Sequence, residues 1–283
     1  MTQPTPSVLL NLQGDFYTRF IDGKKYSNEA LEAIKATVKK LLEQPTSINK
    51  PGMLLGKVQS GKTKTFMGIM ALAFDNAFDV CVVLTKGTKA LTKQTFERLE
   101  KEFAPFNTED LVQVFDIMTI PSSLTAWELN QKLIFVVKKQ ADNLNRLSKA
   151  FFETYRSLSK KKMLIIDDEA DYASIGFKNT KEEGVLINKI AGQIDNLRKD
   201  LADSSFLQVT ATPYSLYLQP DNLEIPATQQ AFKPIRPAFT ELVPVHDNYI
   251  GGNYYFYDSQ EQGSIASFLH EPVTRDELEI FKK

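Results

Sequence analysis

Two glycines, a lysine and a threonine lie close together near residue 60, at a spacing that suits the binding of a phosphate group. Residues 56–63 read Gly-Lys-Val-Gln-Ser-Gly-Lys-Thr and fit the pattern G-x-x-x-x-G-K-[ST]. In such a loop the glycines let the backbone wrap closely around an anion, so that successive N–H groups point at it. Lys62 would reach the β- and γ-phosphates of a nucleotide, and the Thr63 hydroxyl would bind Mg²⁺. These residues predict a site for a nucleoside triphosphate and its magnesium ion.

The sequence on either side of this phosphate loop fits the same interpretation. An apolar run at residues 53–55 precedes the loop, and a helical run at residues 66–74 follows it. Strand, loop and helix in this order aim the helix N-terminus at the phosphates. The residues expected to bind the nucleotide are Gly56, Lys57, Val58, Gln59, Ser60, Gly61, Lys62, Thr63 and Lys64.

Acidic residues follow a second apolar run, at residues 163–166. A nucleotide hydrolase needs one carboxylate for Mg²⁺, which accepts few protein ligands, and a second to orient or deprotonate the attacking water. We assign Asp168 to the metal and Glu169 to the water. Asp167 is the competing metal ligand, because the strand end could lie one residue away. Asp171 is expected to connect to the threonines described next rather than to Mg²⁺.

Two threonines, Thr210 and Thr212, follow the apolar run at residues 206–210 and precede Pro213. Open α/β sheets gather their ligands at the carboxyl ends of strands. The two hydroxyls could hydrogen-bond the acidic residues and couple the state of the nucleotide to movement. Taken alone, the same residues would rather indicate an ordinary threonine-proline strand exit, and it is the other two motifs that favour a functional role.

Strands and helices are expected to alternate along the part of the chain that carries these residues. Helical periodicity begins at Asn28, which we expect to cap that helix, and returns after several of the apolar runs. Continuous apolar runs are typical of strands that are buried on both faces of a parallel sheet. The alternation predicts an α/β fold with a mainly parallel, doubly wound sheet flanked by helices. The expected strands are residues 53–55, 78–85, 112–117, 133–137, 163–166 and 206–210.

The character of the chain changes after Pro213. Five prolines fall within residues 220–244, and helical periodicity disappears. The aromatic residues of 249–257 are expected to form an extended or small β element that packs on the main domain, and residues 275–281 a last helix. We divide the chain into an N-terminal helical segment (1–50), an ATPase domain (51–218) and an extended arm with a C-terminal helix (219–283).

Composition excludes several classes of protein. The net charge of −1 over 283 residues excludes an overall polycationic binder, although a local basic groove stays possible. The single Cys81 excludes internal disulfides and fits a reducing compartment. Two histidines without a cysteine cluster argue against a zinc site. No signal peptide and no apolar run of about 18 residues is present, so we expect a cytoplasmic protein without membrane contact.

The order of these motifs, GKVQSGKT, DDEAD and TATP, resembles motifs I, II and III of superfamily 2 helicase-like ATPases. The loop itself, together with residues 84–91, 167–174, 210–214 and 249–252, looks like the Z1 domain family. Members of that family are large bacterial and phage-associated proteins, described as endonucleases or helicase-like ATPases of restriction and defence systems. The resemblance covers roughly residues 50–260.

The resemblance implies a role for each matching residue. Lys62 and Thr63 would bind the phosphates and Mg²⁺ of ATP, Asp168 would bind Mg²⁺, and Glu169 would be the hydrolytic base. Thr210 and Thr212 would couple hydrolysis to nucleic acid. The partner would be DNA. The contacts expected with it come from Lys86, Thr88 and Lys89, and Lys138 and Lys139 are further candidates, because all follow predicted strand ends. Lysines at such positions are equally typical of solvated loops.

One departure from this pattern shapes the functional hypothesis. Such helicases have two RecA-like domains, and the second supplies arginine fingers, yet no second sheet or Gln-Arg-x-Gly-Arg-like motif follows residue 213. An arginine finger is worth about 10³–10⁵ in rate in other phosphate-loop enzymes. We therefore expect a first motor domain that hydrolyses ATP poorly until a second domain, in cis or from a partner subunit, completes it. The alternative is a nucleotide-gated regulatory or adaptor module that does not translocate on DNA.

Overall fold

The core of the protein is a sheet of seven strands that all run parallel, which confirms the predicted α/β fold. The computed structural model describes residues 8–48, 50–86, 88–170, 181–213, 236–246, 249–261, 263–269 and 273–275. The order across the sheet is β3-β4-β2-β5-β6-β1-β7. The strands are β1 (Gly52–Leu55), β2 (Val80–Thr85), β3 (Val112–Asp116), β4 (Lys132–Lys138), β5 (Lys162–Asp168), β6 (Asp203–Thr210) and β7 (Phe239–Leu242).

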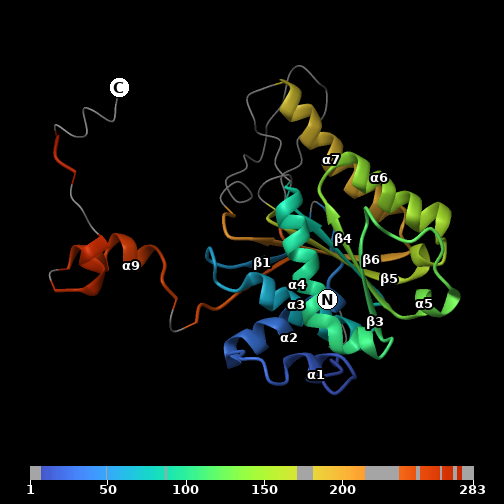
Figure 1. Ribbon diagram of the computed structural model, residues 1–283, viewed down its shortest axis with the longest axis horizontal. Helices are drawn as coiled ribbons and strands as arrows, with labels where there is room; N and C mark the ends of the chain where they lie inside the picture. Colours follow the sequence, from blue (N-terminus) through green and yellow to red (C-terminus); the bar gives the residue numbers. More distant parts are fainter. Residues whose placement is uncertain are drawn as a thin grey trace, which may run out of the picture.

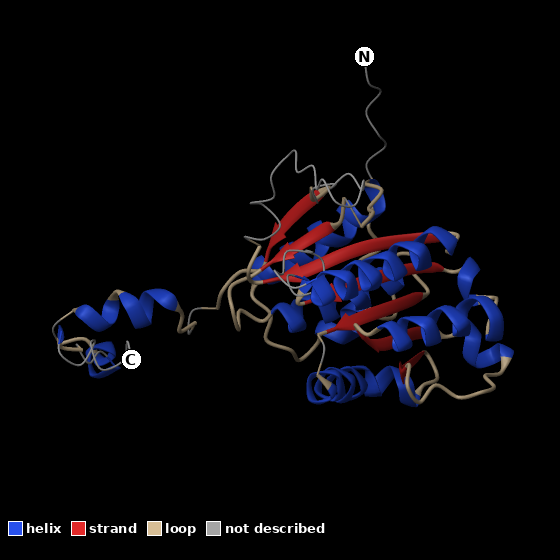
Figure 2. Cartoon of the chain, turned by 90° about the horizontal axis from the view of Figure 1, so that it is seen from above, coloured by secondary structure: helices blue, strands red, loops and turns tan. Residues whose placement is uncertain are grey.

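Helices cover both faces of this sheet (Figures 1 and 2). The first four helices pack on one face and share a hydrophobic core with it, whereas α6, the π-helical turn after it and α7 pack on the other. None of the helices in the described ranges combines the length and apolarity that crossing a membrane requires. The helices are α1 (Tyr17–Ile21), α2 (Asn28–Glu43), α3 (Lys62–Asp75), α4 (Lys89–Thr108), α5 (Ala126–Asn130), α6 (Ala141–Lys149), α7 (Lys181–Asp200) and α9 (Gly252–Phe256).

Successive residues of each central strand enter the two cores in turn. In β5, Leu164 and Ile166 belong to the core shared with α3, and Met163 and Ile165 belong to the core shared with α6 and α7. This is the two-residue period of a strand, with both faces covered by helices. It explains why the sequence shows continuous apolar runs here rather than alternation.

The structure differs from the sequence-based expectations at the start of the chain and near its end. Ser27, rather than Asn28, caps α2, since its hydroxyl accepts a hydrogen bond from Ala30 N. The short strand β7 lies in the proline-rich region, where we expected no strand, and pairs with β1 at the edge of the sheet. Proline is tolerated next to such an edge strand because one side of it needs no hydrogen-bonded partner.

The aromatic region at residues 249–257 is also different from the extended or β element that was expected. Residues 252–256 form helix α9, and two short 3₁₀ helices, Asp258–Gln260 and Ile265–Leu269, follow it. Figures 1 and 2 both show these helices standing apart from the sheet. The proposed last helix lies outside the described residues except for Arg275, and the division of the chain at residues 50 and 218 stays a prediction.

Replacing Gly52 with alanine should loosen the attachment of β7. A Cβ atom at Gly52 would lie 2.5 Å from Cζ of Phe239, a rigid ring that is itself buried. Overpacking of this kind costs about 1–3 kcal/mol of stability. Urea denaturation of Gly52→Ala should show this loss.

Gly192 offers a matched control for this substitution. It lies exposed in α7, and no atom approaches within 4 Å of a Cβ atom built there. Gly192→Ala should therefore stabilise the protein by up to about 1 kcal/mol, because alanine has the higher helix propensity. Equal effects of the two substitutions would contradict the packing described at Gly52.

Candidate active site

The phosphate loop and the acidic residues lie close together at the carboxyl edge of the sheet. Strand β6, which ends at Thr210, lies between them. Strand β6 separates β1 from β5, and its Val209 is paired with Asp168. On its other side, Thr210 is paired with Leu55, and its carbonyl accepts a hydrogen bond from Gly56 N at 3.1 Å. All of these residues therefore lie at the carboxyl ends of neighbouring parallel strands, which is where open α/β sheets bind ligands.

The phosphate loop turns sharply before α3. Gln59 and Gly61 both have positive φ angles, 59° and 91°, and α3 begins directly afterwards at Lys62. The Lys62 ammonium donates a hydrogen bond to the Lys57 carbonyl at 3.0 Å, which folds this side chain back over the loop. The helix N-terminus therefore opens into the loop, as anion binding requires.

Ser60 gives independent support for an anion at this loop. Its side chain is buried, and within the described part of the chain its Oγ atom has no hydrogen-bond partner. A Cβ atom at Gly56 would lie 2.5 Å from this oxygen, so only glycine leaves the space beside it. A buried hydroxyl without a partner costs about 1–3 kcal/mol, which a bound phosphate oxygen would recover.

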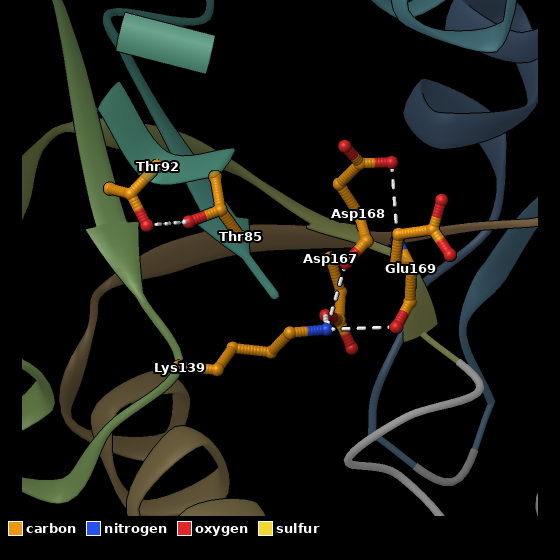
Figure 3. A network of polar contacts seen from close by, with 6 residues as sticks. All are labelled: Thr85, Thr92, Lys139, Asp167, Asp168 and Glu169. Atoms are coloured by element: carbon orange, nitrogen blue, oxygen red, sulfur yellow. Dashed lines mark hydrogen bonds and ion pairs between the residues drawn. The ribbon is translucent and has the colours of Figure 1, made fainter. Parts of the chain in front are cut away.

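Strand alternation separates the two candidate metal ligands. Asp167 points to the face of the sheet that packs on α6 and α7, whereas Asp168 points to the face that carries α3. The Asp167 carboxylate lies 2.7 Å from the ammonium of Lys139, and both side chains are almost fully buried. Figure 3 shows the carboxylates of Asp168 and Glu169 pointing away from that ammonium. The Asp167 carboxylate therefore forms an ion pair with a lysine, whereas the Asp168 carboxylate lies on the face of the sheet that carries the phosphate loop.

The turn at residues 167–169, called the acidic turn below, has two unusual properties. Burial raises the pKa of Asp168 to about 6, the nearby charge of Glu169 adds to this, and Lys139 opposes it. Glu169 adopts a left-handed backbone conformation with φ 54°, and its N–H group donates to the Asp168 carboxylate at 3.1 Å. A half-buried carboxylate pair held in an uncommon backbone conformation is typical of a functional site.

A cavity of about 340 Å³ joins these groups. Thr63, Asp168 and Glu169 line it together with residues at the end of β2 and on helix α4. Two polar residues of α4, Gln94 and Arg98, were not singled out in the sequence, where only their spacing of four on one helix face could have indicated them.

The candidate nucleic-acid contacts fall in different places. Lys86 lines the cavity just described. Thr88 caps α4 by accepting a hydrogen bond from Leu91 N, and Lys89 is the exposed first residue of that helix. The prediction for Lys139 was wrong, because its side chain is 1% exposed and cannot contact a nucleic acid.

Several further predicted residues are held by neighbouring groups. Thr210 is fully buried, and its hydroxyl accepts a hydrogen bond from the N–H group of the exposed Thr212 at 3.0 Å. The Lys64 ammonium bonds the carbonyl of Lys25 and lies over the ring of Tyr26. Asp171 lies outside the described residues.

One contact to the phosphate loop comes from beyond the sheet. The hydroxyl of Tyr249 donates a hydrogen bond to the Val58 carbonyl at 2.8 Å, and the Lys57 ammonium lies 5.6 Å from the centre of the same ring. The tyrosine therefore attaches the segment after β7 to the outer side of the loop. Sequence spacing could not have shown this contact, because the two residues are 191 positions apart.

Comparison with solved structures finds helicases of similar fold. The crystal structure of the DUF1998 helicase MrfA bound to DNA matches 80% of this chain and 29% of that chain, with 15% identity and a TM-score of 0.51. The same helicase bound to DNA and AMPPNP matches 70% of this chain and 26% of that chain, with 15% identity and a TM-score of 0.47. A variant of S. cerevisiae Dbp5 bound to RNA and ADP BeF3 matches 83% of this chain and 54% of that chain, with 18% identity and a TM-score of 0.40.

The likeness to MrfA shows a shared fold, and this chain spans less than a third of that protein's length. No curated protein matches the sequence. A family model, that of the type III restriction enzyme res subunit, matches residues 20–215, which include the phosphate loop, the acidic residues and both threonines. The chain therefore belongs to the family of the type III restriction enzyme res subunit.

Proposed function

We propose that this chain binds ATP with Mg²⁺ at the phosphate loop and hydrolyses it, as the first motor domain of a superfamily 2 helicase-like protein that acts on DNA. The observation that carries the proposal is the shared cavity. Thr63 lies at the start of α3, whereas Asp168 and Glu169 lie at the end of β5, about 100 positions later, yet all three line one space at the carboxyl edge of the sheet. A hydroxyl, a metal-binding carboxylate and a candidate base are the groups that phosphoryl transfer to water requires.

The residues around the cavity have distinct roles in this mechanism. Lys62 and the backbone N–H groups of the loop hold the β- and γ-phosphates, and the Ser60 hydroxyl gains its missing partner there. The oxygens of Thr63 and Asp168 suit Mg²⁺, which when bound neutralises charge on the phosphates. Glu169 orients the attacking water and accepts its proton. Thr210 and Thr212, with Asp171, couple hydrolysis to movement.

Complete activity requires groups that the described sheet does not contain. We infer that a second RecA-like domain, in the same polypeptide or in a partner subunit, closes over the cavity and contributes an arginine. Lys86, Thr88 and Lys89 contact the DNA backbone, as lysine and threonine side chains are suited to do. We infer from the motif resemblance that the protein is of the Z1 type and works in a cytoplasmic restriction or phage-defence system.

Substituting Asp168 tests the metal assignment. We expect Mg²⁺ to tighten the binding of a fluorescent ATP analogue to the wild-type chain, and to have little effect on the Asp168→Asn variant. The reason is that the neutral amide keeps the shape of the carboxylate but removes the charge that attracts the ion. The measurement is a titration of the analogue with and without Mg²⁺.

The matched control is Asp200→Asn, at the last residue of α7 and exposed to solvent. It should behave as the wild type does. A Mg²⁺ effect of unchanged size in Asp168→Asn would contradict the assignment. Brisk ATP turnover by the isolated chain would contradict the need for a second domain. ATP binding without any turnover, even with DNA and that domain restored, would favour the nucleotide-gated regulator instead.

A further inference from the structure

We propose that Lys139 is a positioning residue for ATP hydrolysis, because its ammonium group fixes the backbone turn that carries Asp168 and Glu169. This inference rests on the proposed function. Lys139 directly follows β4, and its backbone N–H bonds the Thr85 carbonyl at the end of β2. Since β2 lies between β4 and β5, the lysine side chain crosses the end of β2 to reach the acidic turn.

Every proton of the Lys139 ammonium is committed to this turn. It donates to Asp167 Oδ1 at 2.7 Å, to the Asp168 carbonyl at 2.8 Å and to the Glu169 carbonyl at 3.0 Å (Figure 3). A lysine has three N–H donors and no acceptor, so these contacts use its full capacity. The lysine side chain is 1% exposed, so water does not compete for them.

Two of the three hydrogen bonds are not needed to neutralise the charge of Asp167. A pairing that served only to balance the buried Asp167 would need one of the protons. The other two instead bind the carbonyls of the residues assigned to the metal and to the water. Glu169 has φ 54°, which non-glycine residues seldom adopt, and the ammonium holds its carbonyl in that conformation. The two functional carboxylates point to the opposite side, toward the cavity.

The arrangement leads to a specific kinetic expectation. The phosphate loop supplies the contacts that bind ATP, and Lys139 does not contact that loop. Loss of Lys139 should therefore lower kcat and leave the KM and Kd for ATP nearly unchanged. Displacement of a catalytic group by about 1 Å can cost about 100-fold in rate.

The test uses the double variant Lys139→Met/Asp167→Asn, because it removes both buried charges together and keeps the shapes of the side chains. We expect it to fold, to bind a fluorescent ATP analogue as tightly as the wild type, and to hydrolyse ATP about 100-fold more slowly than the wild type. Single-turnover assays at high protein concentration measure this difference, because the wild-type chain without its second domain is itself expected to hydrolyse ATP slowly. If it does not fold, Lys139→Arg keeps the charge beside Asp167 but cannot direct three donors from a single nitrogen. The same loss in kcat with unchanged Kd is expected for that variant.

The chain contains a matched control at the opposite edge of the same strands. Lys132, at the start of β4, lies 2.9 Å from Asp79 and also bonds the Phe78 carbonyl. Lys132→Met/Asp79→Asn should leave kcat unchanged. Hydrolysis by the Lys139→Met/Asp167→Asn variant at the wild-type rate would overturn the positioning role alone. Absence of ATP binding by the wild type would overturn the proposed function, and the positioning role with it.

Discussion

Glu169→Gln should stop ATP hydrolysis while ATP continues to bind. Glutamine keeps the size of the side chain, but its amide cannot take a proton from the attacking water. General base catalysis contributes about 10²–10⁴ in rate, so a loss of this size in single-turnover hydrolysis is expected. The affinity for a fluorescent ATP analogue should change little, because Glu169 lies on the acidic turn rather than on the phosphate loop.

Glu100→Gln provides the comparison for this loss. Glu100 lies exposed on α4, so the same chemical change there should leave both hydrolysis and binding as they are in the wild type. Hydrolysis at the wild-type rate by Glu169→Gln would show that another group activates the water. Loss of ATP binding in that variant would mean that Glu169 contributes to the binding of ATP itself and not only to its hydrolysis.

Lys139→Met alone should be the most destabilising of the substitutions considered for this protein. It leaves the Asp167 carboxylate, which is 2% exposed, buried without the ammonium that balances its charge. Removing one partner of a buried ion pair costs about 3–5 kcal/mol. Urea denaturation of the variant should show a loss of this size in the free energy of unfolding.

Two further variants show whether the buried charge is the cause. Asp167→Asn, added to Lys139→Met, should restore much of the stability, because it removes the unbalanced charge. Lys132→Met should cost only about 1 kcal/mol, because the Lys132 and Asp79 side chains are 20% and 37% exposed. Similar losses in Lys139→Met and Lys132→Met would contradict the burial of the Lys139 pair.

The fold could be predicted because its signals are local. The loop that carries Lys62 is flanked by a strand and a helix in the order that phosphate binding requires, and this order needs no knowledge of distant residues. The central strands are buried on both faces, so they appear in the sequence as continuous apolar runs. β7 has no such run, and its existence depends on pairing with β1, which lies far away in the chain.

The sequence indicated which residues lie at the site, but it could not predict the direction in which each side chain points. Sequence alone left Asp167 and Asp168 as alternatives, since a shift of one residue in a strand exchanges its two faces. A lysine after a strand end looks the same whether it faces solvent or a buried carboxylate, and Lys139 was therefore assigned to the wrong partner. Arg98 lines the cavity because of how α4 packs on the sheet, and its spacing of four from Gln94 shows only that the two share a helix face.

ATP binding by the isolated chain tests directly whether residues 56–63 form a nucleotide site. Titration of a fluorescent ATP analogue in the presence of Mg²⁺ should show saturable binding to the wild-type chain. Lys62→Ala should weaken it by about 10- to 100-fold, the value of a hydrogen bond to a charged group. Lys93→Ala, at an exposed position of α4, should not change it. No binding by the wild type, or equal binding by Lys62→Ala, would contradict the assignment of the phosphate loop.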